Sequence, residues 1–129
     1  MQPRLLRMID VKNIPLSLYV HIPWFVRKCP YCDFNSHAEN GALPEHEYLA
    51  ALIADLDLDR PAAQHREVKS IFFGGGTPSL LSPHIIGEFL EAASLRFAFA
   101  ADIEITLEAN PGTTEQRRFR DFRSAGINR

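Results

Sequence analysis

Cysteine is scarce in this chain of 129 residues, which contains two, Cys29 and Cys32. Two cysteines this close in sequence cannot provide the disulfide cross-links of a small secreted domain, so a disulfide-rich fold is excluded and a metal or redox role is favoured. Thiols kept for such a role suit a reducing compartment, and we expect a cytoplasmic protein. The CxxC spacing alone leaves zinc, iron–sulfur and dithiol redox chemistry open.

Long apolar runs and a large excess of charge of one sign are also lacking. No stretch approaches the roughly 20 apolar residues that cross a bilayer, and no signal-type apolar stretch follows a basic N-terminus. The formal net charge is -2, from 14 basic and 16 acidic residues that are well mixed along the chain. We therefore predict no transmembrane segment, and no charge pattern indicates a nucleic-acid partner.

What the chain does contain is an alternation of apolar strands and amphipathic helices. Strands are predicted at residues 16–22, 68–73 and 103–109, with the beginning of a further strand at 127–129. Helices are predicted at residues 45–58, after the cap formed by Ser82 and Pro83, and from Thr113 to a terminator at Gly126. This order indicates an α/β fold of parallel strands with right-handed crossovers. Both a doubly wound sheet and a partial (β/α) barrel of about three units satisfy it.

The length of the chain permits one domain or a piece of a larger one. Residues 1–15 are predicted to be an irregular N-terminal segment, and residues 16–129 a single α/β unit. A complete (β/α)₈ barrel needs about 250 residues, and the chain stops where a fourth strand is expected. We therefore expect a truncated chain.

The segment of residues 19–34 carries a specific resemblance. The radical S-adenosylmethionine (SAM) superfamily places a CxxxCxxC loop after its first barrel strand, and its branch of HemN and HemW proteins has the form YxHIPxCxxxCxxC. This sequence is similar to that form at Tyr19, His21, Ile22, Pro23, Cys29 and Cys32. Phe25 stands where the first of the three cysteines is expected, so the cluster motif is interrupted.

Two further motifs agree with the resemblance and extend it from about residue 16 to the last residue. Residues 74–79 resemble the family's GGGTPS loop, in which glycine lets the backbone approach SAM because it has no Cβ. Residues 107–112 resemble the family's LEANPG segment, whose glutamate contacts SAM. The resemblance implies that SAM is contacted by Tyr19, Tyr31, Gly75, Gly76, Thr77 and Glu108, and that Cys29 and Cys32 are cluster ligands.

The resemblance implies two cofactors, a 4Fe-4S cluster and SAM. Three thiolates hold three irons and leave the fourth open to SAM, but Phe25 offers no ligand atom, so we expect cluster binding to be impaired. Full-length HemW-type relatives also bind haem and deliver it to an acceptor protein. The resemblance alone does not decide whether this chain is an enzyme, and no residue is assigned a catalytic role.

Three functions remain open at this point. A HemW-like haem chaperone is favoured because the residues after Cys32 resemble HemW, whereas HemN carries a further cysteine two residues later. An oxygen-independent coproporphyrinogen III oxidase of porphyrin biosynthesis is the alternative from the enzyme class. A degenerate remnant without a cluster is the third.

Several other residues carry structural expectations. His21 is predicted to brace its loop through a hydrogen bond, and Trp24 either lines the cluster cavity or packs against the fold. Phe119 and Phe122 are predicted to face inward from the third helix. The basic residues of that helix are predicted to form a solvated face: Arg117, Arg118, Arg120 and Arg123.

Overall fold

The computed structural model describes residues 13–25, 37–38, 43–109 and 113–129. In it, a three-stranded sheet has the order β1 (Leu16–Ile22), β4 (Val68–Gly75) and β5 (Phe99–Leu107). Both pairings are parallel, with Phe72 lying beside Tyr19 of β1 and Thr106 of β5. Because the strands are parallel, their carboxyl ends share one edge of the sheet, where the loops that follow them meet.

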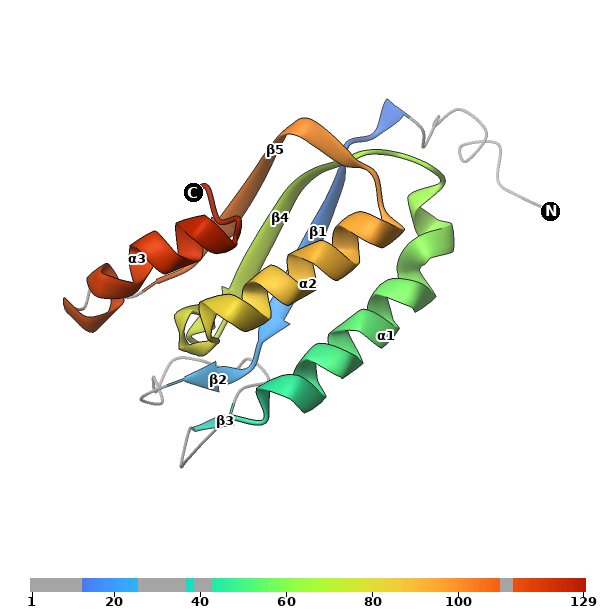
Figure 1. Ribbon diagram of the computed structural model, residues 1–129. Coiled ribbons are helices and arrows are strands. Elements are labelled where there is room, and N and C mark those ends of the chain that lie inside the picture. The colour runs from blue at the N-terminus through green and yellow to red at the C-terminus, as the bar shows by residue number, and fades with distance from the viewer. Residues whose placement is uncertain (1–12, 26–36, 39–42, 110–112) are drawn as a thin grey trace.

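Four helical segments connect and follow these strands: α1 (Glu45–Ala63), η3 (Pro78–Leu80), α2 (Pro83–Arg96) and α3 (Thr113–Ala125). The three longer helices lie on the same side of the sheet, with α2 between α1 and α3 (Figure 1). The three strands of this sheet lie in it in the order in which they follow one another along the chain, and crossovers of one hand then bring the connecting helices to one face. A doubly wound sheet has helices on both faces, so the partial (β/α) barrel is the alternative that is confirmed.

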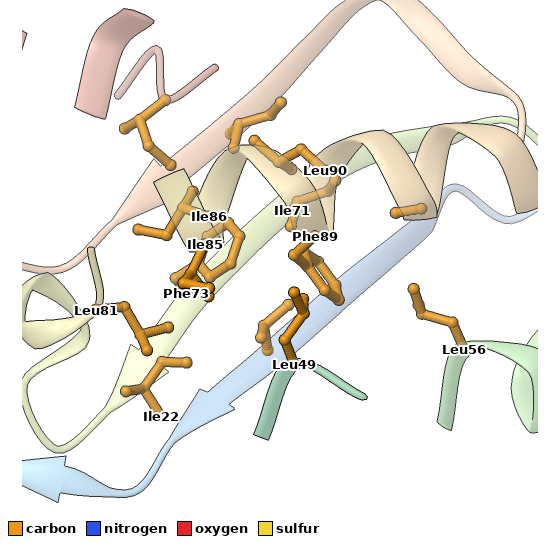
Figure 2. Close-up of a cluster of buried hydrophobic side chains, with 14 of the residues drawn as sticks. Ile22, Leu49, Leu56, Ile71, Phe73, Leu81, Ile85, Ile86, Phe89 and Leu90 are labelled. Carbon is orange, nitrogen blue, oxygen red and sulfur yellow. The ribbon is translucent and has the colours of Figure 1, made fainter. Parts of the chain in front are cut away.

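The hydrophobic core lies between the sheet and these helices. Ile22, Ile71 and Phe73 point from the strands towards α2, which contributes Ile86 and Phe89 (Figure 2). The rings of Phe73 and Phe89 meet edge to face, with centroids 5.7 Å apart and an interplanar angle of 78°. The alternation of buried and open positions in β1 follows from the two-residue period of a strand, which sends one set of side chains to the core.

The opposite face of the sheet is covered by no helix among the described residues. Tyr19 and Phe72 stand on it, with exposed fractions of 60% and 37%. Their rings stack with centroids 6.2 Å apart and an interplanar angle of 16°. In a barrel, the face away from the helices is the interior, so these two rings mark the interior side.

Two helices differ from the sequence-based expectation. Helix α1 continues through Pro61 to Ala63, five residues further than predicted, because Arg66 donates from Nε to the Ala63 carbonyl and from Nη2 to the Ala62 carbonyl. These bonds satisfy carbonyls that the end of a helix leaves without partners. In α3, Phe122 is buried as predicted, but Phe119 is 46% exposed, so the prediction that Phe119 faces inward is wrong.

Strand boundaries differ as well. Strand β4 runs on to Gly75, and β5 begins at Phe99 and ends at Leu107, because pairing with β4 already starts beside Val68. Two short strands that the sequence did not predict, β2 (Trp24–Phe25) and β3 (His37–Ala38), pair in parallel. The predicted turn at residues 110–112 lies outside the described residues.

The C-terminal residues 127–129 run beside β5. Asn128 N–H donates to the Ile105 carbonyl at 2.9 Å, and Leu107 N–H donates to the Arg129 carbonyl at 3.2 Å. The side chain of Asn128 adds bonds to Ile105 N–H and to the Ile103 carbonyl. The helix before them ends at Ala125, and the next residue, Gly126, has a φ of 128°, in the region that favours glycine. These residues therefore follow the direction predicted for a further strand, although they form no regular strand here.

Candidate functional site

The carboxyl ends of the three strands are tied together by backbone hydrogen bonds. Gly76 N–H donates to the Ile22 carbonyl at 2.8 Å, and Thr77 N–H donates to the Trp24 carbonyl at 2.6 Å. On the other side, Glu108 N–H donates to the Phe73 carbonyl at 3.1 Å. The loop after β4 is thereby held between the ends of β1 and β5, which is where ligands of parallel α/β sheets bind.

Gly75 allows the close approach of β4 to β1. Its φ is 114°, and a Cβ placed on it would lie 2.5 Å from the Ile22 carbonyl oxygen and 2.9 Å from Cε1 of His21. A side chain at this position would therefore meet backbone as well as strain. The glycine was predicted to let the backbone approach a cofactor, and in this structure its missing Cβ lets one strand approach another.

A hollow of about 290 Å³ opens beside this loop, lined by Gly76, Thr77, Pro78, Glu108 and Ala109. Three of the residues predicted to contact SAM, Gly76, Thr77 and Glu108, thus come together from two different strand ends. Thr77 is buried, with an exposed fraction of 6%, and its hydroxyl makes none of the hydrogen bonds found among the described residues. Glu108 is exposed, so one carboxylate borders a hollow that suits a ligand carrying a positively charged group.

Tyr19 lies on the helix-free face of the sheet, apart from the residues that line the hollow. Its hydroxyl is 2.9 Å from Nδ1 of His21, and its ring stacks on Phe72. His21 is hydrogen-bonded as predicted, through its ring to Tyr19 and through its backbone carbonyl to the Tyr48 hydroxyl, and its bracing of the loop stays a prediction. Burial raises the pKa of Tyr48, with smaller contributions from Asp55 and Tyr19.

The described residues on either side of the cysteine-bearing segment pair with each other. Trp24 pairs with His37, and Phe25 pairs with Ala38. The Trp24 ring packs edge-on against Tyr48, with centroids 4.7 Å apart, which is the packing alternative of its two predicted roles. Cys29, Tyr31 and Cys32 lie outside the described residues. Among the described residues, no group of three His, Cys, Asp or Glu side chains could hold a metal ion.

Arg118 corrects the prediction of a solvated basic face on α3. It donates from Nη1 to the Ser79 carbonyl at 2.7 Å and from Nη2 to the Leu81 carbonyl at 2.9 Å. Its guanidinium also lies 5.1 Å from the centroid of the Phe122 ring. Four arginines share this helix, and no pattern in the sequence distinguishes the one that binds the loop after β4.

Comparisons with known proteins agree with this arrangement. The family model of the radical SAM superfamily matches residues 19–129. The chain belongs to the radical SAM superfamily. Membership implies the use of SAM and an iron–sulfur cluster. In the described part of this radical SAM chain, no helix is long and apolar enough to cross a membrane.

Within the superfamily, the chain is similar to proteins named haem chaperone HemW. It is 59% identical to the one from Escherichia coli K12 over 119 residues, covering 92% of this chain and 32% of the relative. The one from Haemophilus influenzae is 53% identical, with 89% and 31% covered. This radical SAM chain thus spans about a third of the length of these relatives.

Among solved structures, the chain is similar to HemN from Escherichia coli, described as a coproporphyrinogen III oxidase and a radical SAM enzyme. The TM-score is 0.79 at 32% identity, over 91% of this chain and 27% of that one. The likeness confirms the expected fold class, a partial (β/α) barrel of the radical SAM type.

Proposed function

We propose that residues 16–129 are the N-terminal part of a HemW-like core domain, belonging to a protein that binds haem and delivers it to an acceptor. The observation that carries this proposal is the hollow at the carboxyl edge of the sheet, where Gly76, Thr77 and Glu108 meet. The similarity to HemW chaperones over 92% of the chain supports the haem-delivery part. The identity of the haem acceptor is not specified by these residues.

SAM fits the chemistry of this hollow. Its amino group and sulfonium are cationic, and Glu108 supplies an exposed carboxylate that would accept hydrogen bonds from the amino group. Gly76 leaves room for the ligand to approach the backbone, and the buried Thr77 hydroxyl is positioned beside it. Gly75 would act by holding the strand ends together, and Tyr19 and Tyr31 are proposed as further contacts outside the hollow. When bound, SAM would supply a sulfonium, whose carbon–sulfur bond is cleaved reductively in this superfamily.

The cluster does not fit the chain in the same way. A site-differentiated 4Fe-4S cluster needs three thiolates, and the whole sequence contains two cysteines, Cys29 and Cys32. Phe25 occupies the third position without a ligand atom. We propose that Phe25 impairs cluster binding, and we assign these residues no step that passes through the cluster.

Anaerobic reconstitution with iron and sulfide tests this proposal on three versions of the chain: the parent, Phe25→Cys and Phe25→Ser. Serine matches cysteine in shape but is a poor ligand for iron–sulfur clusters, so it separates the effect of a thiolate from that of a smaller side chain. We expect about four irons per chain only in Phe25→Cys, with an electron paramagnetic resonance signal after reduction that shifts on adding SAM. Equal iron binding and an equal SAM-dependent shift in the parent chain would refute the impairment.

Coproporphyrinogen III oxidation is a second candidate function, favoured by the likeness to the HemN structure. Phe34 stands against it, because HemN-type proteins carry a further cysteine at that position, two residues after the last cluster cysteine. Turnover of coproporphyrinogen III by the longer protein with cysteine at position 25 would support the oxidase, whereas haem binding and transfer without turnover would support the chaperone. A remnant without a cluster would show neither.

A further inference from the structure

The side chain of Arg118 connects two segments that border the proposed SAM site. It extends from α3 to the η3 turn, where its two terminal nitrogens bind the carbonyls of Ser79 and Leu81 at 2.7 Å and 2.9 Å. The η3 turn directly follows Gly76 and Thr77. Helix α3 follows Glu108 and Ala109 along the chain and begins at Thr113. One guanidinium therefore joins the two elements that follow the walls of the hollow along the chain.

The contact is built to hold one geometry. Ser79 and Leu81 are almost fully buried, with exposed fractions of 1% and 2%, so their carbonyls depend on partners within the protein. A guanidinium presents two donors in a fixed plane, which suits two acceptors two residues apart. The Phe122 ring, 5.1 Å from the guanidinium carbon, limits its movement on the side of the helix.

Backbone hydrogen bonds also hold the two walls of the hollow. Thr77 N–H is bonded to the Trp24 carbonyl, and Glu108 N–H is bonded to the Phe73 carbonyl. Phe73 belongs to β4, the strand that leads into Gly76 and Thr77, so this second bond already links the two walls next to the sheet. The bonds of Arg118 add a further link, between the segments that follow the two walls. A change in this side chain is therefore expected to alter the separation of Thr77 and Glu108 while leaving the sheet intact.

We propose that Arg118 is a positioning residue that sets the separation between the wall formed by Gly76, Thr77 and Pro78 and the wall formed by Glu108 and Ala109. This role rests on the proposed binding of SAM in the hollow. Among the described residues, the hydrogen bonds of Arg118 go to Ser79 and Leu81, which do not line the hollow, so Arg118 acts through the η3 turn.

Three substitutions separate this role from general destabilisation. Arg118→Met keeps an unbranched stem but removes both donors, and Arg118→Lys keeps the charge but loses the planar fork. Arg120→Met is the matched control, because Arg120 is exposed on the same helix. The measurements are amide hydrogen exchange at Gly76 and Thr77, SAM affinity by equilibrium dialysis, and thermal unfolding, all on the 129-residue chain with Phe25→Cys after reconstitution.

We expect exchange at Thr77 to accelerate and SAM affinity to fall by about tenfold in Arg118→Met, as for the loss of a charge-assisted bond to a buried acceptor. Arg118→Lys should show a smaller change in both quantities, and Arg120→Met should show none. A lower unfolding temperature with unchanged exchange at Thr77 and unchanged SAM affinity would show that Arg118 only stabilises the fold, and would overturn the proposal.

The outcomes also distinguish this inference from the proposed function. If the Phe25→Cys chain with Arg118 intact does not bind SAM, the SAM site is rejected. The exchange rates at Gly76 and Thr77 would still decide whether Arg118 holds the loop. If Arg118→Met does not fold, the Arg118→Lys variant tests the positioning role. Exchange rates and a SAM affinity equal to those of the Phe25→Cys chain with Arg118 intact would refute that role.

Discussion

The Ile22 carbonyl oxygen lies 2.5 Å from the point where a Cβ on Gly75 would stand. The same carbonyl accepts the hydrogen bond from Gly76 N–H at 2.8 Å. The end of β4 can thus bind the end of β1 only because position 75 has no side chain. The close approach of β4 to β1 beside the hollow therefore depends on glycine at this position.

Replacing Gly75 with alanine should therefore destabilise the chain. The new Cβ would meet backbone at a φ of 114°, and together the clash and the strain should lower the free energy of unfolding by about 2–4 kcal/mol. Gly87→Ala is the matched control, because its Cβ would find ordinary contacts at 3.8 Å or more inside α2. That variant should gain up to about 1 kcal/mol. Urea denaturation measures both, and equal stabilities of the two variants would contradict the close approach.

Glu108→Gln tests the charge at the hollow. If the carboxylate accepts hydrogen bonds from the SAM amino group, its loss should weaken SAM binding by roughly tenfold to a hundredfold, as for bonds to charged groups. Stability should change by less than about 0.5 kcal/mol because the side chain is exposed. Equilibrium dialysis with the reconstituted Phe25→Cys chain gives the affinity. Glu91→Gln, an exposed glutamate on α2, should leave it unchanged, and an equal loss in both variants would argue for a general charge effect.

The raised pKa of Tyr48 predicts that the free energy of unfolding depends on pH in the alkaline range. Burial raises the pKa of its phenol in the folded chain, so the folded state keeps its proton to higher pH than the unfolded state. The contribution of this group to stability is fully present below the unfolded pKa of about 10 and is lost as pH rises through the folded pKa.

The Tyr48→Phe variant removes this group and its hydrogen bond to the His21 carbonyl. It should be less stable than the parent at pH 7 by about 1 kcal/mol. The stability of the parent should fall more steeply than that of the variant above pH 10. Chemical denaturation at a series of pH values gives both curves, and parallel curves would show that Tyr48 does not carry the dependence.

Much of the fold could be predicted from the sequence because its signals are local. The apolar run of residues 16–22 gave the bounds that β1 has, and the pair of Ser82 and Pro83 marked the start of α2, where Ser82 accepts a bond from Ile85 N–H. The motif residues Gly76, Thr77 and Glu108 were also predicted, and they line one hollow. Their role as SAM contacts remains a prediction, as do those of Tyr19, Tyr31 and the two cysteines.

Other features depended on partners distant in the chain and left no local signal. The extension of α1 to Ala63 rests on Arg66, and the burial of Phe122 but not Phe119 depends on which side of α3 meets the core. The two-residue strands β2 and β3 form only by pairing with each other. Pattern-based prediction cannot find such elements, since a two-residue strand has no period.

The sequence by itself determined the alternation of the three long strands and three long helices, the cap of α2 at Ser82 and the lack of a third cysteine, because each is a property of neighbouring residues. The tertiary structure alone decided between a doubly wound sheet and a barrel, since that choice depends on the face to which each crossover returns. It also decided that Arg118, among four arginines of one helix, binds the loop after β4. The physical reason is the same in both cases: these contacts join residues about 40 or more positions apart, and only the packed chain brings them within hydrogen-bonding distance.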